Sequence, residues 1–386
     1  MNVKLCIVTH NVVKGNGQGR VNYEVAWEAI RRGYDVILLA SQVASELQQH
    51  SQVRWIYIPV KGWPTEILRN MIFSWRSSNW LRQHRSEFDV VKANGAITTA
   101  PTNVNAVHFV HSSWLKFSAI GAMPKSVKNV LNPRGVLYDF YQWLYTSMNA
   151  RWEKSAFEQA QVVVAVSDKV GKDLLEIGVP PERLQVIFNG VDLQEFSPGV
   201  SDRSLWKLPQ DVPLALFAGD IRIPRKNLDT VLHALIKVPD LHLAVAGITE
   251  GSPYLQLAAS LGLNERVHFL GLCHDVPQLM KAVDFLVFPS RYDPFGLVVI
   301  EAMACGLPVI TAVTTGAAEL VKPEAGIVLS DPNDTEALAQ ALSSLASDRT
   351  LRSQMGQAAR SLAEQHSWQL MAKNYVDVFE ELVKSS

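Results

Sequence analysis

The chain has 386 residues, of which 48% are hydrophobic and 19% are charged, and this globular composition excludes a disordered, collagen-like or low-complexity protein. At about 150 residues per domain, a chain of this length predicts two domains or three small ones. The formal net charge of −1 excludes an overall basic surface for nucleic acid, although residues 1–190 hold 21 Lys and Arg against 14 Asp and Glu and the remainder is acidic.

The first half of the sequence predicts strands that alternate with helices. Lys4–Thr9 is an apolar run typical of a buried parallel strand, and Val21–Arg32 has the periodicity of an amphipathic helix. With a second apolar strand at Asp35–Ala40 they predict a βαβ unit. The remaining elements of this half are strands at Val53–Ile58, Asp89–Ala93, Val104–Val110, Gln161–Val166 and Leu184–Phe188, and a helix at Asp168–Ile177 capped by Ser167.

A stretch rich in proline, glycine and serine at Phe196–Pro213 predicts a linker, and the alternation restarts after it. The second series comprises strands at Leu214–Ala218, Leu241–Ala246, Val267–Leu270, Phe285–Pro289 and Pro308–Thr311, and helices at Leu228–Ile236, Tyr254–Leu261, Val276–Ala282, Gly296–Ala304, Thr335–Ser347, Leu351–Gln365 and Trp368–Val383. Such alternation favours parallel sheets covered on both faces. The sequence therefore predicts an α/β protein with two doubly wound, Rossmann-like domains facing a central cleft, with ligands at the carboxyl ends of the strands.

The cysteines and the apolar runs indicate the compartment. Cys6, Cys273 and Cys305 are far apart and form no CxxC pair, which fits a reducing environment. The first residues lack the hydrophobic region of a signal peptide, and no apolar run approaches the ~18 residues of a membrane-spanning helix. We therefore expect a cytoplasmic protein.

The segment 114–152 is rich in aromatic residues with basic residues between them. Its members are Trp114, Phe117, Tyr138, Phe140, Tyr141, Trp143, Tyr145 and Trp152, with Lys116, Lys125, Lys128 and Arg134. This mixture suits a peripheral contact with an anionic membrane surface. The alternative is an inserted helical pair whose aromatic residues pack on the domain core, whereas stacking on nucleic acid is disfavoured.

A glycine-rich loop, Gly15-x-Gly17-x-Gly19, follows the first strand. Glycines let a backbone approach a ligand closely, and a helix that starts nearby offers amides to an anion. The third glycine comes too early for the dinucleotide fingerprint, and no acidic residue follows the second strand, so NAD binding is disfavoured. A plain flexible turn is the alternative.

Three cations, Arg222, Arg225 and Lys226, crowd the loop after the first strand of the second half. A pyrophosphate needs such groups, because an Arg fork matches its oxygens and Lys supplies a point charge. A solvated basic loop before a helix is the alternative.

The strongest signal lies between Asp293 and Glu301, eight residues apart around a predicted helix start. Gly296 and Leu297, directly after Phe295, would present free backbone amides to a phosphate. The Glu301 carboxylate would accept hydrogen bonds from ribose hydroxyls, and Asp293 would face a sugar. A capped helix with two unrelated acids is the alternative.

His111 follows an apolar strand at the edge where ligands bind, and it is a candidate general base or donor to a substrate. A lone histidine is, however, more often structural. The sequence has no Asp-x-Asp pair, the usual carboxylate hook for a metal-bound nucleotide, and no P-loop, His-Glu-x-x-His or Gly-x-Ser-x-Gly motif. We therefore expect neither a metal nor a cofactor.

Together these residues resemble the family-4 retaining glycosyltransferases, of the "glycosyl transferases group 1" type, which have the GT-B fold. The likeness is densest over Asn189–Gly306 and includes the signature of an acidic residue, seven residues and Glu. Two positions differ from the family pattern: Asp293 replaces the usual Glu, and Asp220 replaces an Arg. The role of that Arg would pass to Arg222 or Arg225.

The resemblance implies that residues 1–198 bind the acceptor, that residues 199–367 bind a nucleotide-diphosphate sugar, and that a helix at 368–386 packs back on the first domain. It places Gly17, Gly19 and His111 in the active site and assigns the donor phosphates to Arg225 and Lys226. It also implies metal-free transfer with retention of configuration. The protein would move a hexose from a UDP- or GDP-sugar to a polysaccharide, lipopolysaccharide, glycolipid or small-molecule acceptor.

In this reading Arg225, Lys226 and the amides of Phe295–Leu297 would stabilise the charge that develops on the leaving β-phosphate. Asp293 would orient the sugar, because no enzyme nucleophile is evident and attack from the face of the departing phosphate accounts for retention. Two alternatives stay open: a nucleotide-sugar epimerase or hydrolase on the same fold, and a non-catalytic subunit that binds a nucleotide sugar.

Overall fold

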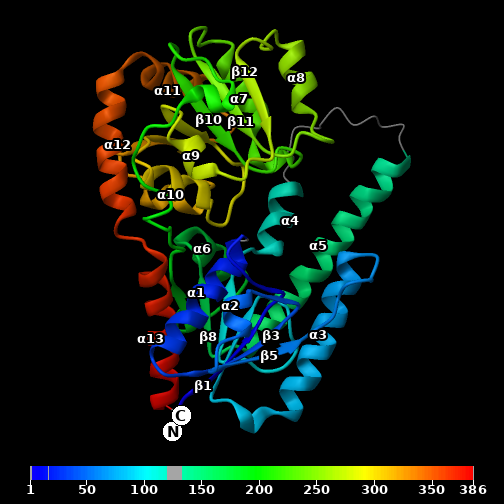
Figure 1. Ribbon diagram of the computed structural model, residues 1–386. Helices are drawn as coiled ribbons and strands as arrows, with labels where there is room; N and C mark the ends of the chain where they lie inside the picture. Colours follow the sequence, from blue (N-terminus) through cyan, green and yellow to red (C-terminus); the bar gives the residue numbers. More distant parts are fainter. Residues whose placement is uncertain (1, 16, 120–132, 386) are drawn as a thin grey trace. The chain divides into compact units, whose positions relative to one another are not determined.

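A computed structural model describes residues 2–15, 17–119 and 133–385, with side chains described outside 117–140 (Figure 1). The chain divides into two compact units, Met1–Asn189 with Trp368–Ser386 and Gly190–Ser367. The boundary after Asn189 precedes the linker that the sequence predicts, and the last helix is grouped with the first unit.

A parallel sheet of seven strands forms the centre of the first unit, in the order β5-β3-β1-β6-β7-β8-β9. Its strands are β1 (Lys4–Val8), β3 (Asp35–Ala40), β5 (Val53–Tyr57), β6 (Val90–Asn94), β7 (Val104–Val107), β8 (Val162–Ala165) and β9 (Leu184–Val186). In the central strand, Cys6 aligns with Ile37 of β3 and Val91 of β6. Residues 5–8 are fully buried, as expected for a strand covered on both faces.

The helices of this unit are α1 (Gly17–Arg31), α2 (Ser45–Gln48), α3 (Glu66–Gln83), α4 (His111–Ala119), α5 (Pro133–Gln159), α6 (Asp168–Glu176) and α13 (Trp368–Ser385), and a small pair of strands joins β2 (Asn11–Val12) to β4 (Gln42–Val43). As predicted, Ser167 caps α6, since its Oγ accepts the Val170 N–H at 3.2 Å. No helix in the described part of the chain is long and apolar enough to cross a bilayer.

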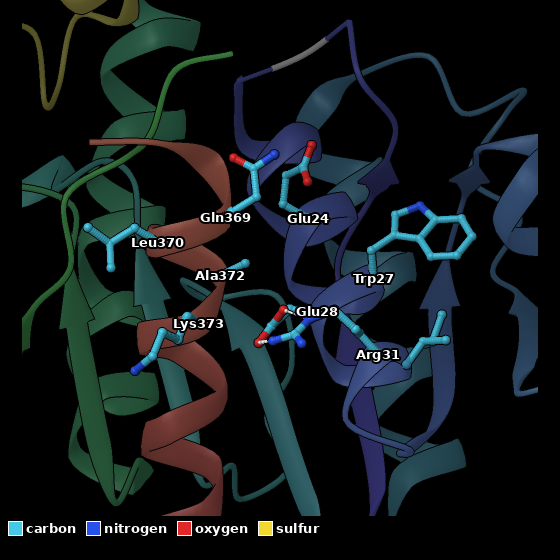
Figure 2. A pocket seen from close by; sticks show the side chains of 9 residues that line it. Glu24, Trp27, Glu28, Arg31, Gln369, Leu370, Ala372 and Lys373 are labelled. Atoms are coloured by element: carbon cyan, nitrogen blue, oxygen red, sulfur yellow. Dashed lines mark hydrogen bonds and ion pairs between the residues drawn. The ribbon is translucent and has the colours of Figure 1, made fainter. Parts of the chain in front are cut away.

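Helix α13 lies beside α1, although the two are far apart in sequence (Figure 2). Arg32, just after α1, joins them by pairing with Asp377 at 2.8 Å and Glu380 at 2.7 Å. An open groove of about 620 Å³ runs between the helices, with Trp27 of α1 and Leu370 of α13 in its walls. Through α13 the end of the chain thus becomes part of the first unit.

Helix α3, which the sequence analysis does not predict, packs against α5. The Tyr141 hydroxyl accepts the N–H of Ile67, and the Tyr145 hydroxyl accepts Nδ2 of Asn70, both at 3.4 Å. Tyr141 and Tyr145 thus agree with the alternative in which the aromatic residues pack within the domain, whereas Trp143 is 58% exposed. The side chains of Phe117, Lys125, Lys128, Arg134, Tyr138 and Phe140 lie outside the described set, so the membrane interpretation of 114–152 stays a prediction.

The second unit contains a parallel sheet of six strands in the order β12-β11-β10-β13-β14-β15. The strands are β10 (Leu214–Ala218), β11 (His242–Ala246), β12 (Val267–Gly271), β13 (Phe285–Phe288), β14 (Val309–Ala312) and β15 (Gly326–Leu329), and the helices are α7 (Leu228–Leu235), α8 (Tyr254–Ser260), α9 (Val276–Met280), α10 (Leu297–Ala304), α11 (Thr335–Ser347) and α12 (Arg349–Ala363). All five residues of β10 are buried, as expected for a strand covered on both faces. The prediction of two Rossmann-like parallel sheets is confirmed.

Two boundaries near predicted site residues differ from the sequence analysis. Helix α1 begins at Gly17 rather than Val21, so Gly17 and Gly19 belong to a helix and not to a loop. Strand β7 ends at Val107, and His111 is the first residue of α4 rather than the residue after a strand. Helix α1 therefore extends at its start beyond the apolar periodicity visible in the sequence, since tertiary context overrides local propensity.

Candidate active site

Two loops of the second unit meet at the carboxyl edge of its sheet. Residues 219–227 follow β10, and residues 289–296 follow β13, which pairs with β10. Along the chain, the strands that follow β10 are added first on one side of it (β11, β12) and then on the other (β13, β14, β15). Open α/β sheets bind ligands at such a switch point, at the carboxyl ends of the strands. The cations and acids predicted from the sequence lie in these loops or directly after them.

Buried polar side chains fix the two loops to each other. Asn227 is fully buried at φ +68°, and its Nδ2 donates to the carbonyl oxygen of Pro289 at 2.8 Å. Arg291 is 2% exposed and donates to both oxygens of Asp229, at 2.9 and 2.6 Å. Its own N–H donates to the Arg225 carbonyl at 2.8 Å. Buried hydrogen bonds of this kind favour a single backbone geometry for the two loops.

Lys226, Arg225 and Asp293 form one charged cluster. Lys226 Nζ lies 2.5 Å from Asp293 Oδ2, and Arg225 Nη1 lies 3.9 Å from the same oxygen. Asp293 is only 8% exposed. Burial would raise the pKa of Asp293, but the charges of Lys226 and Arg225 outweigh it and hold that pKa below its usual value. Asp293 is thus the acidic partner of both cations, and its contact with a sugar stays a prediction.

Arg222, the other candidate for the missing family Arg, is engaged elsewhere. It pairs with Asp220 in a bidentate contact of 2.9 Å from Nε and 2.7 Å from Nη2. This hydrogen bonding by Arg222 lowers the pKa of Asp220, so the acid stays ionised. Arg225 is therefore the better candidate for a phosphate ligand.

Helix α10 starts beside the charged cluster. Its N-cap, Gly296, has φ +83°, and a Cβ there would lie 2.6 Å from Cγ2 of Thr315, so the turn requires glycine. Within the described residues, the amides of Gly296 and Leu297 have no hydrogen-bond partner. The Phe295 amide donates to Asp293 Oδ1 at 3.3 Å, and its contact with a donor phosphate stays a prediction.

Glu301 lies in the second turn of α10 and is partly exposed. In the described part of the chain its carboxylate has no hydrogen-bond donor. Desolvation, with a smaller contribution from the neighbouring charge of Glu195, raises the pKa of Glu301 to about 7. The carboxylate is therefore available to a ligand and titrates near neutral pH.

In the first unit, His111 is held by a buried acid. Nδ1 of His111 lies 2.5 Å from Glu153 Oε1, and the His111 backbone N–H donates to Glu153 Oε2 at 2.9 Å. Glu153 comes from α5 and is 3% exposed. One carboxylate thus caps the start of α4 and orients the imidazole ring, with Nδ1 facing the acid.

His111 lines a cavity of about 280 Å³ in the first unit. Its wall includes residues that follow β1 and β7, the end of β6, and side chains of α3 and α5. Among them are His10, Glu66, Asn70, Asn94 and Glu153. The cavity lies at the carboxyl edge of the sheet, beside the central pair β1 and β6, where the sequence analysis places a ligand.

Gly17 and Gly19 form the first turn of α1. A Cβ on Gly19 would lie 3.0 Å from the Val13 carbonyl oxygen, so this glycine allows the helix to approach the preceding segment closely. Its observed role is packing, and contact with a donor phosphate stays a prediction.

The structure brings Arg225, Lys226, Asp293 and the start of α10 together in the second unit, and it places His111 in the first. Sequence reasoning missed Glu153, Asn227 and Arg291. Asn227 directly follows the cationic pair, in a position where a capping residue would be suspected, but Glu153 has no local signal. Three or more His, Cys, Asp or Glu side chains suited to a metal ion do not gather anywhere in the described residues.

Two family models match the chain: "Glycosyltransferase Family 4" over residues 15–195 and "Glycosyl transferases group 1" over residues 201–362. A D-inositol 3-phosphate glycosyltransferase of Salinispora tropica is 32% identical over 256 residues. That match covers 60% of this chain and 53% of the relative, so the chain matches about half the length of that protein.

Solved structures with the same fold cover nearly the whole chain. WaaG, a glycosyltransferase involved in lipopolysaccharide biosynthesis, matches with a TM-score of 0.74 at 23% identity, over 97% of this chain and 99% of that one. Anabaena HepE in complex with UDP-glucose matches with a TM-score of 0.72 at 21% identity, over 98% and 100%. At this identity the likeness establishes the architecture of the two sheets.

Proposed function

Because the chain belongs to the family-4 glycosyltransferases and has their GT-B architecture, we propose that it transfers a hexose from a UDP- or GDP-sugar to a hydroxyl group, with retention of configuration. The acceptor is a precursor of a cell-envelope polysaccharide, lipopolysaccharide or glycolipid. The reaction needs no metal and no cofactor. The protein acts in the cytoplasm, with peripheral contact at the inner face of an anionic membrane through 114–152, and takes no nucleic acid.

The observation that carries this proposal is the cationic cluster at the start of α10. Cleavage of the donor leaves negative charge on the β-phosphate, and fixed cations and amides stabilise such charge best when they are already in place. Arg225 and Lys226 supply two cations, and Gly296 and Leu297 supply unpartnered amides. These groups do the work that a divalent ion does in other transferases.

Asp293 keeps the two cations ready before the donor binds. Its carboxylate sits against Lys226 at 2.5 Å, so the ammonium is oriented within the loop rather than extended into solvent. A bound diphosphate shares Lys226 with Asp293 and adds a second set of acceptors to Arg225. Asp293 is thereby a group that orients donor and cations, not a nucleophile.

Retention follows if the acceptor attacks from the face that the phosphate leaves. The hydroxyl oxygen forms the new glycosidic bond as the bond to the β-phosphate oxygen breaks, and the departing phosphate oxygen takes the hydroxyl proton. His111, oriented by Glu153, donates or accepts a hydrogen bond to a substrate hydroxyl. Glu301 accepts hydrogen bonds from the ribose.

The donor and acceptor classes are supported by comparison. HepE has been crystallised with UDP-glucose, and WaaG is involved in lipopolysaccharide biosynthesis. An excess of basic residues in 1–190 and the exposed Trp143 on α5 support contact of the first unit with an anionic surface.

A thermal-shift panel of UDP- and GDP-sugars tests the proposal. At least one donor raises the melting midpoint of the wild-type protein, because it binds the native state alone, and the shift persists in EDTA. The same donor then glycosylates an envelope-type acceptor, and NMR of the product shows the retained anomer. No shift with any donor, or turnover that EDTA abolishes, overturns the proposal.

A further inference from the structure

Asn94, the last residue of β6, lines the cavity that also contains His111. It is 5% exposed, and its Oδ1 accepts a hydrogen bond from Lys92 Nζ at 3.1 Å. Nδ2 of the same amide is buried and has no partner among the described residues. A buried N–H without a partner costs free energy that a bound acceptor atom recovers. Asn94 therefore offers the cavity a hydrogen-bond donor that no described residue uses.

Lys92 determines which end of the Asn94 amide faces the cavity. Lys92 is fully buried, and its Nζ also donates to Asn22 Oδ1 at 2.6 Å. Asn22 is itself fixed, because its Nδ2 donates to Thr9 Oγ1 at 3.2 Å and to the Gln18 carbonyl oxygen at 3.0 Å. An ammonium only donates, so a flipped Asn94 amide would set one donor against another. Lys92 is not among the described residues that line the cavity, which leaves the Nδ2 end of Asn94 to face it.

A second polar atom of the same wall has no partner. Nε2 of His108 is buried without a hydrogen bond in the described part of the chain, and His108 lines the same cavity. Burial, with a smaller contribution from the charge of Lys92, lowers the pKa of His108 to about 3, so its ring is neutral at pH 7. A neutral imidazole exchanges a hydrogen bond with a hydroxyl group as donor or as acceptor. Both atoms therefore favour a ligand that carries hydroxyl groups.

From these contacts we infer that Asn94 binds the acceptor in the transferase reaction proposed above, on which this inference rests, that its Nδ2 donates to one hydroxyl oxygen, and that Lys92 is its positioning residue. The cavity volume of about 280 Å³ is close to the lower limit of ligand pockets and suits a single sugar ring. A site built around such a donor rejects an analogue that lacks the oxygen, because the donor is then left unpaired. Asn94 thus contributes to the choice of acceptor.

Calorimetry on the intact chain tests the role of Asn94 by removing single oxygens from a ligand. The probes are the methyl glycosides of glucose, mannose and galactose at pH 6, where Lys92 is protonated because burial lowers its pKa only to about 7. The glycoside that binds most tightly is compared with analogues that each lack one hydroxyl group. We expect one deoxygenation to weaken binding to the wild-type protein about tenfold, and the same one to weaken binding to Asn94→Ala less than threefold.

Asn70→Ala is the matched control. Asn70 lines the same cavity, but its Oδ1 lies 3.1 Å from His10 Nε2 and its Nδ2 donates to the Tyr145 hydroxyl at 3.4 Å. The sensitive deoxygenation should therefore still weaken binding to Asn70→Ala about tenfold. A penalty that persists in Asn94→Ala, or that falls equally in both variants, overturns the assignment of Asn94. Failure of all three glycosides to bind overturns it as well.

Lys92→Met tests the positioning role. Without the ammonium the Asn94 amide is free to turn, so the penalty of the sensitive deoxygenation should fall at least twofold while the penalties of the other deoxygenations stay the same. A merely structural loss would weaken the binding of the parent glycoside and of every analogue alike. An unchanged penalty in Lys92→Met would show that Lys92 does not position Asn94.

Titration of the same wild-type sample with UDP- and GDP-sugars separates this inference from the transferase proposal. Donor binding, together with an undiminished deoxygenation penalty in Asn94→Ala, defeats the inference and leaves the transferase proposal standing. Absence of donor binding defeats the transferase proposal itself.

Discussion

The charged cluster of the second unit consists of two cations that share one acid. Arg225→Ala and Lys226→Ala should each remove about 2–4 kcal/mol of transition-state stabilisation, a fall in kcat/KM of roughly 30- to 1,000-fold. The loss should appear mainly in kcat, because the leaving-group charge develops in the transition state. Steady-state kinetics with the donor identified in the thermal-shift panel measures it.

Arg222→Ala is the control for this prediction. Its guanidinium is bound by Asp220 at the surface, so the variant should keep kcat/KM within about threefold of wild type, in line with the small worth of exposed ion pairs. Near-normal turnover in either Arg225→Ala or Lys226→Ala would show that the substituted residue does not stabilise the donor phosphate.

The proposed contact of Glu301 with the donor ribose predicts that donor binding depends on pH. Its pKa is raised to about 7, so the carboxyl is protonated below that pH and ionised above it. Ribose hydroxyls donate to the ionised form, so donor affinity should rise as the pH increases from 6 to 8 and then level off. Calorimetry across this range should show the rise in wild type, and Glu301→Gln should bind about tenfold more weakly with no such rise.

A neighbouring acid offers a sharper check on the same titration. Glu195 contributes to the raised pKa of Glu301 by like-charge repulsion. Glu195→Gln should therefore move the midpoint of the affinity curve to lower pH. A midpoint that stays in place would show that another group titrates.

At the scale of elements, the start of α10 depends on one glycine. Gly296→Ala combines the strain of a positive φ, about 1–2 kcal/mol, with a clash against Thr315 that adds about 1–3 kcal/mol. Urea unfolding should show the loss of stability, and donor KM should rise because the amides move.

Two further variants separate strain from clash. Gly251→Ala, at φ +76° with open space around it, should cost only the strain. Adding Thr315→Ser to Gly296→Ala removes the methyl group that clashes and should restore part of the stability. A double variant no more stable than Gly296→Ala would exclude the clash.

At the scale of the whole molecule, Lys92 links the stability of the first unit to pH. Burial lowers its pKa from 10.5 to about 7 in the folded state. Between pH 7 and 10.5 the unfolded chain therefore binds more protons, and stability rises with pH across that window. Below pH 7 the cost of burying the charge is fully present.

Lys92→Met should abolish this rise, so the difference in unfolding free energy between wild type and variant should change by on the order of 2 kcal/mol from pH 7 to 9. Tryptophan fluorescence follows the first unit, because Trp206 is the single tryptophan between residues 190 and 367. Lys61 is exposed, so Lys61→Met is the control, and its free energy of unfolding should show the same pH dependence as that of wild type. If the free energy of unfolding of Lys92→Met also showed the same pH dependence as that of wild type, Lys92 would not titrate in this window.

Local patterns in the sequence determined most elements of both sheets and the cluster of site residues after β10 and β13. Strand Leu214–Ala218 and helix Thr335–Ser347 match the prediction residue for residue. Helix α3 escaped it because its pattern is mixed: its buried face combines Phe73 and Leu81 with Ser77 and Ser78, while Trp75 is 62% exposed. Periodicity reveals a helix clearly only when apolar residues are confined to the buried face.

The sequence by itself therefore determined the alternation of strands and helices, the caps and the residue types at the carboxyl edge of the second sheet, since each follows from neighbours along the chain. Only the tertiary structure decided the partners. Lys226 meets Asp293 across 67 residues, and His111 meets Glu153 across 42. These residues come together because sheet order and helix packing, rather than spacing along the chain, decide which side chains are neighbours. Each such contact therefore depends on elements that lie outside any local sequence pattern.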